Sequence, residues 1–156
     1  MLKSKYLKEL VRRLALFTGI ILFCGIAEGS EDLADLVEKR LSKDGTVLDL
    51  GGLKIGISGA KKLAKMKELA KVEVLLLQGN KIQYKGMKAL AKSPFVNNII
   101  ELDLWGNYLG DLGLKALIDS SNFNNLETLK LWRNEIGDDG LELMINSEKF
   151  KSLKTL

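Results

Sequence analysis

Residues 72–93 read VEVLLLQGNKIQYKGMKALAKS, and the same arrangement returns as IIELDLWGNYLGDLGLKALIDS at 99–120 and as LETLKLWRNEIGDDGLELMINS at 126–147. Each stretch begins 27 residues after the previous one. Aliphatic residues and one glycine return at the same positions in successive copies. The aligned positions are Val72, Ile99, Leu126 and Leu153; Leu48, Leu75, Leu102, Leu129 and Leu156; Leu50, Leu77, Leu104 and Leu131; Ile55, Ile82, Leu109 and Ile136; and Gly59, Gly86, Gly113 and Gly140. Such agreement indicates a repeat protein, in which each unit packs on its neighbours.

Two kinds of periodicity follow each other within a unit. The L-x-L segment alternates apolar residues with others, which predicts a short strand. From the glycine onward, as in GMKALAKS at residues 86–93, apolar residues recur at i, i+3 and i+4, which predicts a helix. One strand and one helix per unit, stacked along the chain, predict an α/β fold with a parallel sheet on one side and helices on the other.

The segment LKLWRNEIGDDGLELM at residues 129–144 has the pattern LxLxxNxIGxxGxxxL and resembles the leucine-rich repeat of the ribonuclease-inhibitor type. The resemblance implies a right-handed solenoid in a short horseshoe arc, with parallel strands on the concave side and helices on the convex side. It also implies that one asparagine per unit turns inward and hydrogen-bonds the backbone of the bend, where buried peptide groups need partners. These asparagines are Asn80, Asn107 and Asn134, whereas the unit from residue 45 has Leu53 at this position.

The period also predicts how the chain is divided. We expect an amphipathic capping helix at residues 1–17, because its apolar residues fall on one helical face. A leucine-rich repeat domain is expected at 18–156. It consists of a degenerate repeat at 18–44, repeats from about residues 45, 72, 99 and 126, and a partial repeat at 153–156.

The stretch LALFTGIILFCGIAEGS at residues 14–30 has a second interpretation. It follows five basic residues and contains no charge between Arg13 and Glu28, which is typical of a secretory signal. A membrane-spanning helix is less well supported, because it needs about 20 apolar residues. In register with the repeats, Ile21 and Phe23 take the positions of the strand leucines, which favours the degenerate repeat. We therefore expect a cytoplasmic protein, with a secreted or membrane-associated protein as the alternative.

The composition excludes several kinds of chemistry. The sequence has no histidine, so neither a histidine base nor a histidine zinc ligand can be built from it. The lone Cys24 rules out an internal disulfide and fits a reducing compartment. We expect no enzyme, no cofactor and no metal site; Asp111, Asp138 and Asp139 fall at predicted helix starts, where acidic residues favour the helix dipole. The net charge of +4 lies in residues 1–27, and the remainder is neutral, so no nucleic-acid partner is expected.

The outward-facing positions of the predicted strands hold the candidate binding residues. The only two tryptophans, Trp105 and Trp132, take the same position in adjacent units, so we expect their rings side by side on the exposed face of the sheet. Tryptophan is enriched at the hot spots of protein interfaces. The alternative is that both indoles fold over the adjacent loops and cover the sheet. The predicted partner-binding residues are Trp105, Trp132, Gln78, Asp103, Lys130, Glu101, Asp49 and Leu76.

These features predict a protein–protein interaction module that presents a rigid concave surface to a partner protein. The alternative is a structural or accessory subunit, docked in a larger assembly through the N-terminal helix and the C-terminal end. At that end Leu131, Ile136, Leu141 and Ile145 are expected to face outward, which also leaves self-association open. Membrane contact through residues 1–27 is a less favoured alternative.

Overall fold

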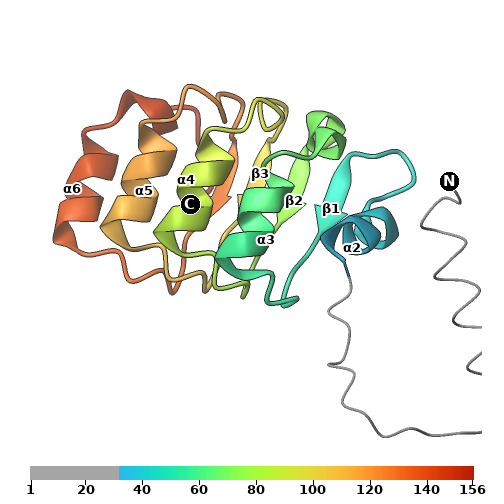
Figure 1. Ribbon diagram of the computed structural model, residues 1–156. Helices are drawn as coiled ribbons and strands as arrows, with labels where there is room; N and C mark the ends of the chain where they lie inside the picture. Colours follow the sequence, from blue (N-terminus) through green and yellow to red (C-terminus); the bar gives the residue numbers. More distant parts are fainter. Residues whose placement is uncertain (1–31) are drawn as a thin grey trace, which may run out of the picture. The chain divides into compact units, whose positions relative to one another are not determined.

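The computed structural model describes residues 32–156. This part of the chain forms a stack of strand–helix units, in which the helices lie together on one side of the strands (Figure 1). The strands are β1 (Val47–Asp49), β2 (Val74–Leu76), β3 (Glu101–Asp103) and β4 (Thr128–Lys130). The helices are α2 (Leu33–Arg40), α3 (Gly56–Leu63), α4 (Gln83–Ala91), α5 (Gly110–Ile118) and α6 (Asp138–Ile145), with short 3-10 helices η1 (Lys67–Lys71) and η2 (Glu148–Phe150).

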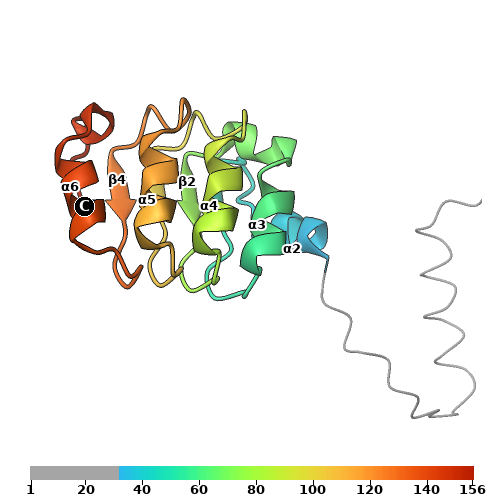
Figure 2. The ribbon, with the colours of Figure 1, turned by 60° about the vertical axis from the view of Figure 1, so that its left-hand side comes forward.

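The four strands form one parallel sheet in the order β1-β2-β3-β4, which confirms the predicted α/β arrangement. Residues 27 positions apart are paired, because Leu48 lies beside Leu75, Leu75 beside Leu102, and Leu102 beside Leu129. Beyond β4, Thr155 makes a parallel bridge to Thr128, again 27 residues apart. The repeat length therefore equals the register of the sheet. Figure 2 shows α4, α5 and α6 side by side in front of the strands.

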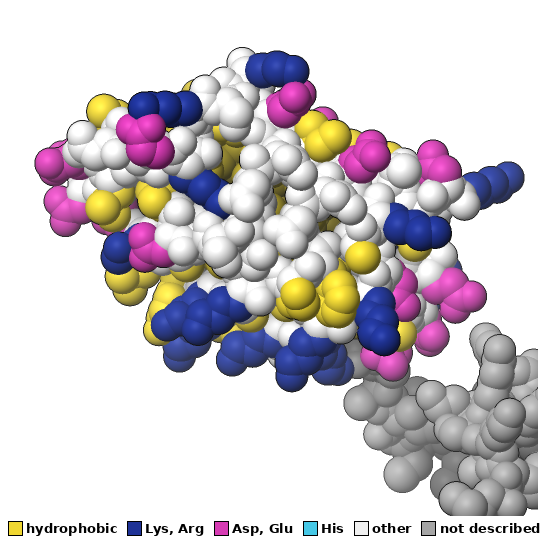
Figure 3. Space-filling view, turned by 90° about the horizontal axis from the view of Figure 1, so that it is seen from above, with side chains coloured by type: hydrophobic (Ala, Val, Ile, Leu, Met, Phe, Trp, Pro, Cys, Tyr) yellow, Lys and Arg dark blue, Asp and Glu magenta, His cyan; other side chains and the backbone are white. Residues whose placement is uncertain are grey.

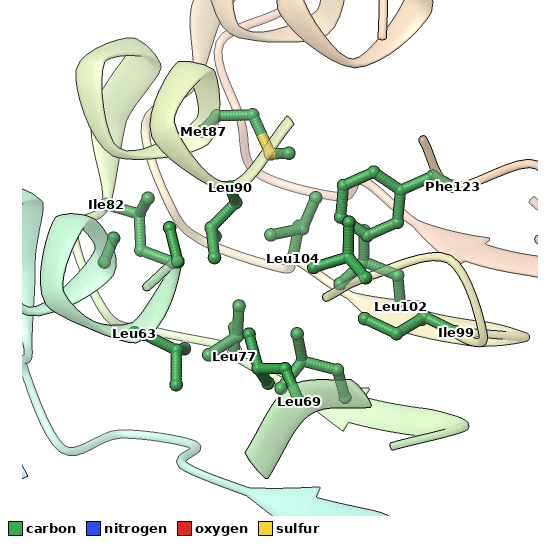
Figure 4. Close-up of a cluster of buried hydrophobic side chains, with 14 of the residues drawn as sticks. Leu63, Leu69, Leu77, Ile82, Met87, Leu90, Ile99, Leu102, Leu104 and Phe123 are labelled. Carbon is green, nitrogen blue, oxygen red and sulfur yellow. The ribbon is translucent and has the colours of Figure 1, made fainter. Parts of the chain in front are cut away.

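The core lies between the sheet and the helices and is filled by the repeating aliphatic positions. The middle residue of each strand is fully buried, while its two neighbours are half-buried on the opposite face. Figure 4 shows Leu77 and Leu104 on the strand side facing Leu90 of α4, and Leu102 near Ile99 and Phe123. Each fully buried leucine contributes about 2 kcal/mol of transfer free energy, so the leucine positions are the main source of stability.

One asparagine per unit connects the turn after its strand to the neighbouring units. The side chain of Asn107 is fully buried. Its Nδ2 donates to the carbonyl oxygens of Leu77 and Leu104, both at 2.9 Å. Its Oδ1 accepts from the backbone N–H groups of Asn80 and Ile82, both at 3.2 Å. One side chain thus satisfies four buried backbone groups, in its own unit and in the preceding one.

The same hydrogen bonds recur at Asn80 and Asn134, so the three buried asparagines form a ladder along the stack. Asn80 donates to Leu50 O at 2.8 Å and accepts from the N–H of Ile55 at 3.2 Å. Asn134 accepts from the N–H of Asn107 at 3.0 Å. The ladder fixes the turns between strand and helix, and these turns hold the residues discussed below.

The N-terminal edge of the sheet differs from the regular units. Leu41, directly after α2, makes an antiparallel bridge to Leu48 of β1. The chain reverses in a turn where the carboxylate of Asp44 accepts hydrogen bonds from Ser42 Oγ at 2.5 Å and from the backbone N–H of Thr46 at 3.1 Å. This turn uses the outer edge of β1, where a regular unit has a parallel strand.

Helix α2 covers this end of the core through Leu33 and Val37, which are buried, while Leu36 is only partly buried. The regular register aligns Leu36 with Leu63 of α3, so α2 begins about one turn later than a regular unit would place it. The expected cap at residues 1–17 and the strand positions Ile21 and Phe23 lie outside the described residues. Among residues 32–156, no helix has the length and apolar character that crossing a bilayer requires.

Candidate protein-binding face

The half-exposed side chains on the sheet side include all eight residues that the sequence predicted for partner binding. Trp132 and Trp105 are the most accessible of them, with 72% and 41% of their surface exposed. The other six are half-buried: Asp49, Leu76, Gln78, Glu101, Asp103 and Lys130. We call these eight residues, together with Arg133 and Tyr108 at the adjoining turns, the sheet face.

Charged side chains next to the tryptophans are paired with each other. Lys130 Nζ lies 2.8 Å from Glu101 Oε1 and 3.7 Å from Asp103 Oδ2. The hydrogen bond to Glu101 raises the pKa of Lys130 above its usual value. Asp103 also accepts a hydrogen bond from the backbone N–H of Trp105 at 3.0 Å. The position of Trp105 is therefore coupled to an ion-paired network that spans β3 and β4.

Arg133 covers one face of the Trp105 ring. Its guanidinium carbon lies 5.2 Å from the ring centroid, which is within the range of a cation–π interaction. Arg133 has a positive φ of 54°, and the equivalent positions in the other units are Gly52, Gly79 and Gly106, all with positive φ. A non-glycine residue in this conformation costs roughly 1–2 kcal/mol. The sequence places the arginine there despite this cost.

Trp105, Arg133 and Tyr108 line a hollow of about 370 Å³ at the edge where the strands turn into the helices. Lys81 and Glu135 complete its wall, together with the backbone of two glycines. Tyr108 is 49% exposed. A hollow of this volume accommodates one large side chain of a partner and has both apolar and charged walls.

Sequence reasoning missed Tyr108, Lys81 and Glu135 as site residues. The three occupy the same repeat position, two or three residues before the start of each helix, and all have positive φ. This position holds a charged residue in the other units, so a tyrosine there was the available signal of an exposed aromatic ring.

Trp132 has different neighbours from Trp105. It lines a separate, mostly apolar hollow of about 440 Å³ at the C-terminal end of the stack, with Leu131, Ile136, Leu141, Met144 and Leu156. The structure thus places the two tryptophans in adjacent units but beside different hollows. Neither ring is buried by the loops around it.

Gln78 occupies the tryptophan position one unit earlier. Its amide lies against Gly51, where an added Cβ would come within 2.3 Å of Nε2. Its Oε1 is buried and has no hydrogen-bond partner in the described part of the chain. Gly51 and Gln78 take the tryptophan position in the two units before Trp105, so the exposed tryptophans lie only in the units of β3 and β4 within the described residues.

One of the acidic residues at the helix starts, Asp111, serves as a hydrogen-bond acceptor. Asp111 Oδ1 accepts from the backbone N–H of Gly137 at 2.8 Å, which connects α5 to the next turn. Within residues 32–156, no three histidine, cysteine or acidic side chains come together as a metal site would require.

Comparison with known proteins gives one match, to two segments of the repeat. The family model of the leucine-rich repeat matches residues 69–91 and 124–144. Searches of curated proteins and of solved structures gave no match. The first matched segment runs from η1 to the end of α4, and the second includes β4 and most of α6. The matched segments and the parallel 27-residue register together support a leucine-rich repeat protein.

Proposed function

We propose that this chain is a non-catalytic protein-interaction module of the ribonuclease-inhibitor type, which binds a partner protein through the sheet face. The observation that supports the proposal is the exposure of both tryptophans, in adjacent units and on the same side of the sheet. Leucine-rich repeats are commonly protein-interaction modules, and their exposed sheet positions vary without disturbing the core. Exposed tryptophans are not needed for folding, and they dominate the energetics of many interfaces.

The surroundings of Trp105 support rigid presentation of the binding residues. Asp103 holds its backbone, Arg133 covers its ring, and buried Asn107 fixes the following turn. A residue already held in its bound conformation loses little entropy on binding, which raises affinity. The hollow beside it is suited to an apolar or aromatic side chain of the partner. A carboxylate next to that side chain would pair with Arg133 or Lys81, which both line the hollow.

The alternative, an accessory subunit docked in a larger assembly, has one observation in its favour. The apolar hollow at the C-terminal end includes Leu141 and Leu156, which are both exposed. Permanent interfaces are more apolar than transient ones. Size-exclusion chromatography separates the two proposals, because a docked subunit should self-associate or aggregate when isolated, whereas a transient binder should elute as a monomer.

The proposal also covers the shape of the solenoid, the N-terminal residues and the location of the protein in the cell. It includes a right-handed arc with the sheet on the concave side, a cap at residues 1–17, a degenerate repeat at 18–44 and a cytoplasmic location. The support for the last two is the 27-residue register of Ile21 and Phe23 and the single cysteine of the sequence.

Affinity capture with three baits tests the proposed function. The baits are the unaltered chain, Trp105→Ala/Trp132→Ala, and the control Tyr84→Ala, which removes an exposed aromatic ring from α4 on the helical side. Hot-spot residues contribute about 2 kcal/mol or more each, so the double variant should bind the captured protein at least a hundredfold more weakly. Its melting temperature should stay close to that of the unaltered chain. Equal capture by all three baits would refute the proposal.

A further inference from the structure

A second surface, on the helical side, has an unusual local charge. Residues 28–156 hold equal numbers of basic and acidic residues, which suggested no attraction to anionic partners. The charges are nevertheless segregated. Residues 54–92 contain ten lysines and two acidic residues, a net charge of +8, whereas residues 93–156 have a net charge of −4. Residues 54–92 are therefore strongly basic, although residues 28–156 as a whole are neutral.

The fold gathers six of these lysines on the adjacent helices α3 and α4 and at the turns that follow them. All six are exposed, and Figure 3 shows dark blue side chains gathered along the helical side, over α3 and α4. The 27-residue register places Lys61 beside Lys88 and Lys65 beside Lys92 in neighbouring units. Packed helices lie about 8–10 Å apart, so these lysines share one side of the domain. We define the lysine face by Lys61, Lys62, Lys65, Lys85, Lys88 and Lys92.

No ion pair neutralises these six lysines within residues 32–156. In two pairs, Lys61 with Lys65 and Lys88 with Lys92, the first lysine lies in the last turn or turns of its helix and the second lies just after the helix ends, so like charges gather at the ends of α3 and α4. The next unit is different, because Asp119 replaces the lysine at the position of Lys92 and pairs with Lys115 at 2.9 Å. An anionic partner would relieve the repulsion between the lysines of α3 and α4 and of the turns that follow them.

The residue types on the lysine face distinguish between anionic partners. Interfaces with proteins are depleted in lysine and enriched in aromatic residues and arginine. Proteins that read nucleic acids use arginine and stacked aromatic rings. Residues 54–92 contain no arginine, and the single tyrosine on α4, Tyr84, has Lys85 over its ring at 5.9 Å. Clusters of four to eight basic residues on an amphipathic helix or beside a membrane segment are typical of contact with anionic lipid headgroups.

Two further observations favour a lipid surface. Lys88 and Lys92 line a hollow of about 380 Å³ with Ser120, Ser121, Asn122, Asp119 and two alanines. The carboxylate of Asp119 is paired with Lys115 at 2.9 Å, so the two lysines leave the hollow with a net positive charge, which suits a phosphate-bearing headgroup. The sequence of residues 1–27 adds a net charge of +4 and an uncharged stretch of fourteen residues, and stable membrane attachment generally needs two such signals. We propose that the lysine face binds the surface of an anionic phospholipid membrane. The sheet face lies on the other side of the domain and remains free for a protein partner (Figure 1).

Vesicle co-sedimentation of the full chain tests this proposal. Neutral phosphatidylcholine vesicles are compared with vesicles containing about 30% phosphatidylserine, in low salt and in roughly 0.5 M salt, where charges are screened beyond a few ångströms. The face variant is Lys61→Gln/Lys65→Gln/Lys88→Gln/Lys92→Gln. The control variant is Lys43→Gln/Lys115→Gln/Lys151→Gln/Lys154→Gln, which removes the same charge from exposed lysines elsewhere.

The unaltered chain should bind anionic vesicles at least tenfold more tightly than neutral ones, and salt should remove the difference. Each lysine near the surface contributes up to about fivefold, so the face variant should lose well over tenfold, while the control variant should lose little. Binding to neutral vesicles reports any contribution of residues 1–27 and should be equal in all variants. Equal losses in the two variants would overturn the proposal, as would binding that ignores lipid charge. A face-dependent preference for a nucleic-acid oligonucleotide over anionic vesicles would overturn it as well.

Discussion

Replacement of Asn107 by alanine should cost more stability than any exposed substitution in the chain. The change leaves the buried N–H groups of Asn80 and Ile82 without partners. The carbonyl oxygens of Leu77 and Leu104 each lose one of two donors, because Asn80 and Asn134 still donate to them. Each unsatisfied buried group costs about 1–3 kcal/mol, and water entering the vacated space will recover part of this. Two such groups give an expected loss of about 3 kcal/mol, a large part of the 5–15 kcal/mol that stabilises a typical domain.

Aspartate at the same position separates hydrogen bonding from packing. Asn107→Asp keeps the size of the side chain but replaces the donor Nδ2 with an oxygen, which then faces two carbonyl oxygens. The buried carboxylate cannot donate unless it is protonated, so this variant should be at least as unstable as Asn107→Ala at neutral pH and should recover partly in acid.

Urea unfolding followed by circular dichroism measures both effects, with Asn97→Ala, at an exposed position, as the control. The midpoint should fall strongly for both Asn107 variants and stay unchanged for the control. A loss below about 1 kcal/mol for Asn107→Ala, or an aspartate variant as stable as the unaltered chain, would show that the ladder does not stabilise the stack.

Three other changes have defined outcomes. Gly86→Ala should destabilise the fold by about 1 kcal/mol despite the better helix propensity of alanine, because the added methyl group would lie 2.9 Å from the Ala60 Cβ. Thermal unfolding measures this loss. A stabilised variant would contradict the close packing of α3 and α4. Lys149→Met should lower the free energy of unfolding by about 2 kcal/mol, because Lys149 Nζ donates to three oxygens of the loop at residues 120–124. An unchanged melting temperature in the same assay would show that these hydrogen bonds do not stabilise the fold. Hydrogen bonds from Ser42 and Thr46 lower the pKa of Asp44 to about 2, so their stabilising effect is present above the usual value of 3.8 and is lost as the pH falls through about 2. An NMR titration should show this low midpoint and its rise in Ser42→Ala; an unchanged midpoint in that variant would exclude Ser42 as the main cause.

The repeating part of the fold was predictable because one period determines several features at once. Leu48, Leu75, Leu102 and Leu129 are equivalent in the sequence and are paired and buried in the sheet. A short strand with one buried residue has few alternative registers, since a slip of one residue would expose its leucine. The period fixed nothing about the N-terminal edge, where local hydrogen bonds of Asp44 reverse the chain and Leu41 pairs in the antiparallel sense.

The two surfaces were predictable to different degrees. Alternation along the strands was enough to place Trp105 and Trp132 on the outer side of the sheet. It could not show that Arg133 covers the Trp105 ring, because this contact depends on a left-handed backbone conformation that glycine adopts in the other units. The net charge of residues 28–156 is zero, so the total charge gave no sign of the lysine face. Aligning Lys61 with Lys88 by the same period that aligned the leucines would have revealed it.

Fluorine NMR tests the central claim, that the sheet face is the protein-binding surface, most directly. A chain labelled with fluorotryptophan has only two labelled positions, Trp105 and Trp132, and an unlabelled partner adds no signal. When the captured partner protein is added, we predict that the resonances of both tryptophans shift and lose their accessibility to solvent, and that the lysine-face variant behaves in the same way. Saturating partner that leaves both resonances unchanged would contradict the claim and place the interface elsewhere on the molecule.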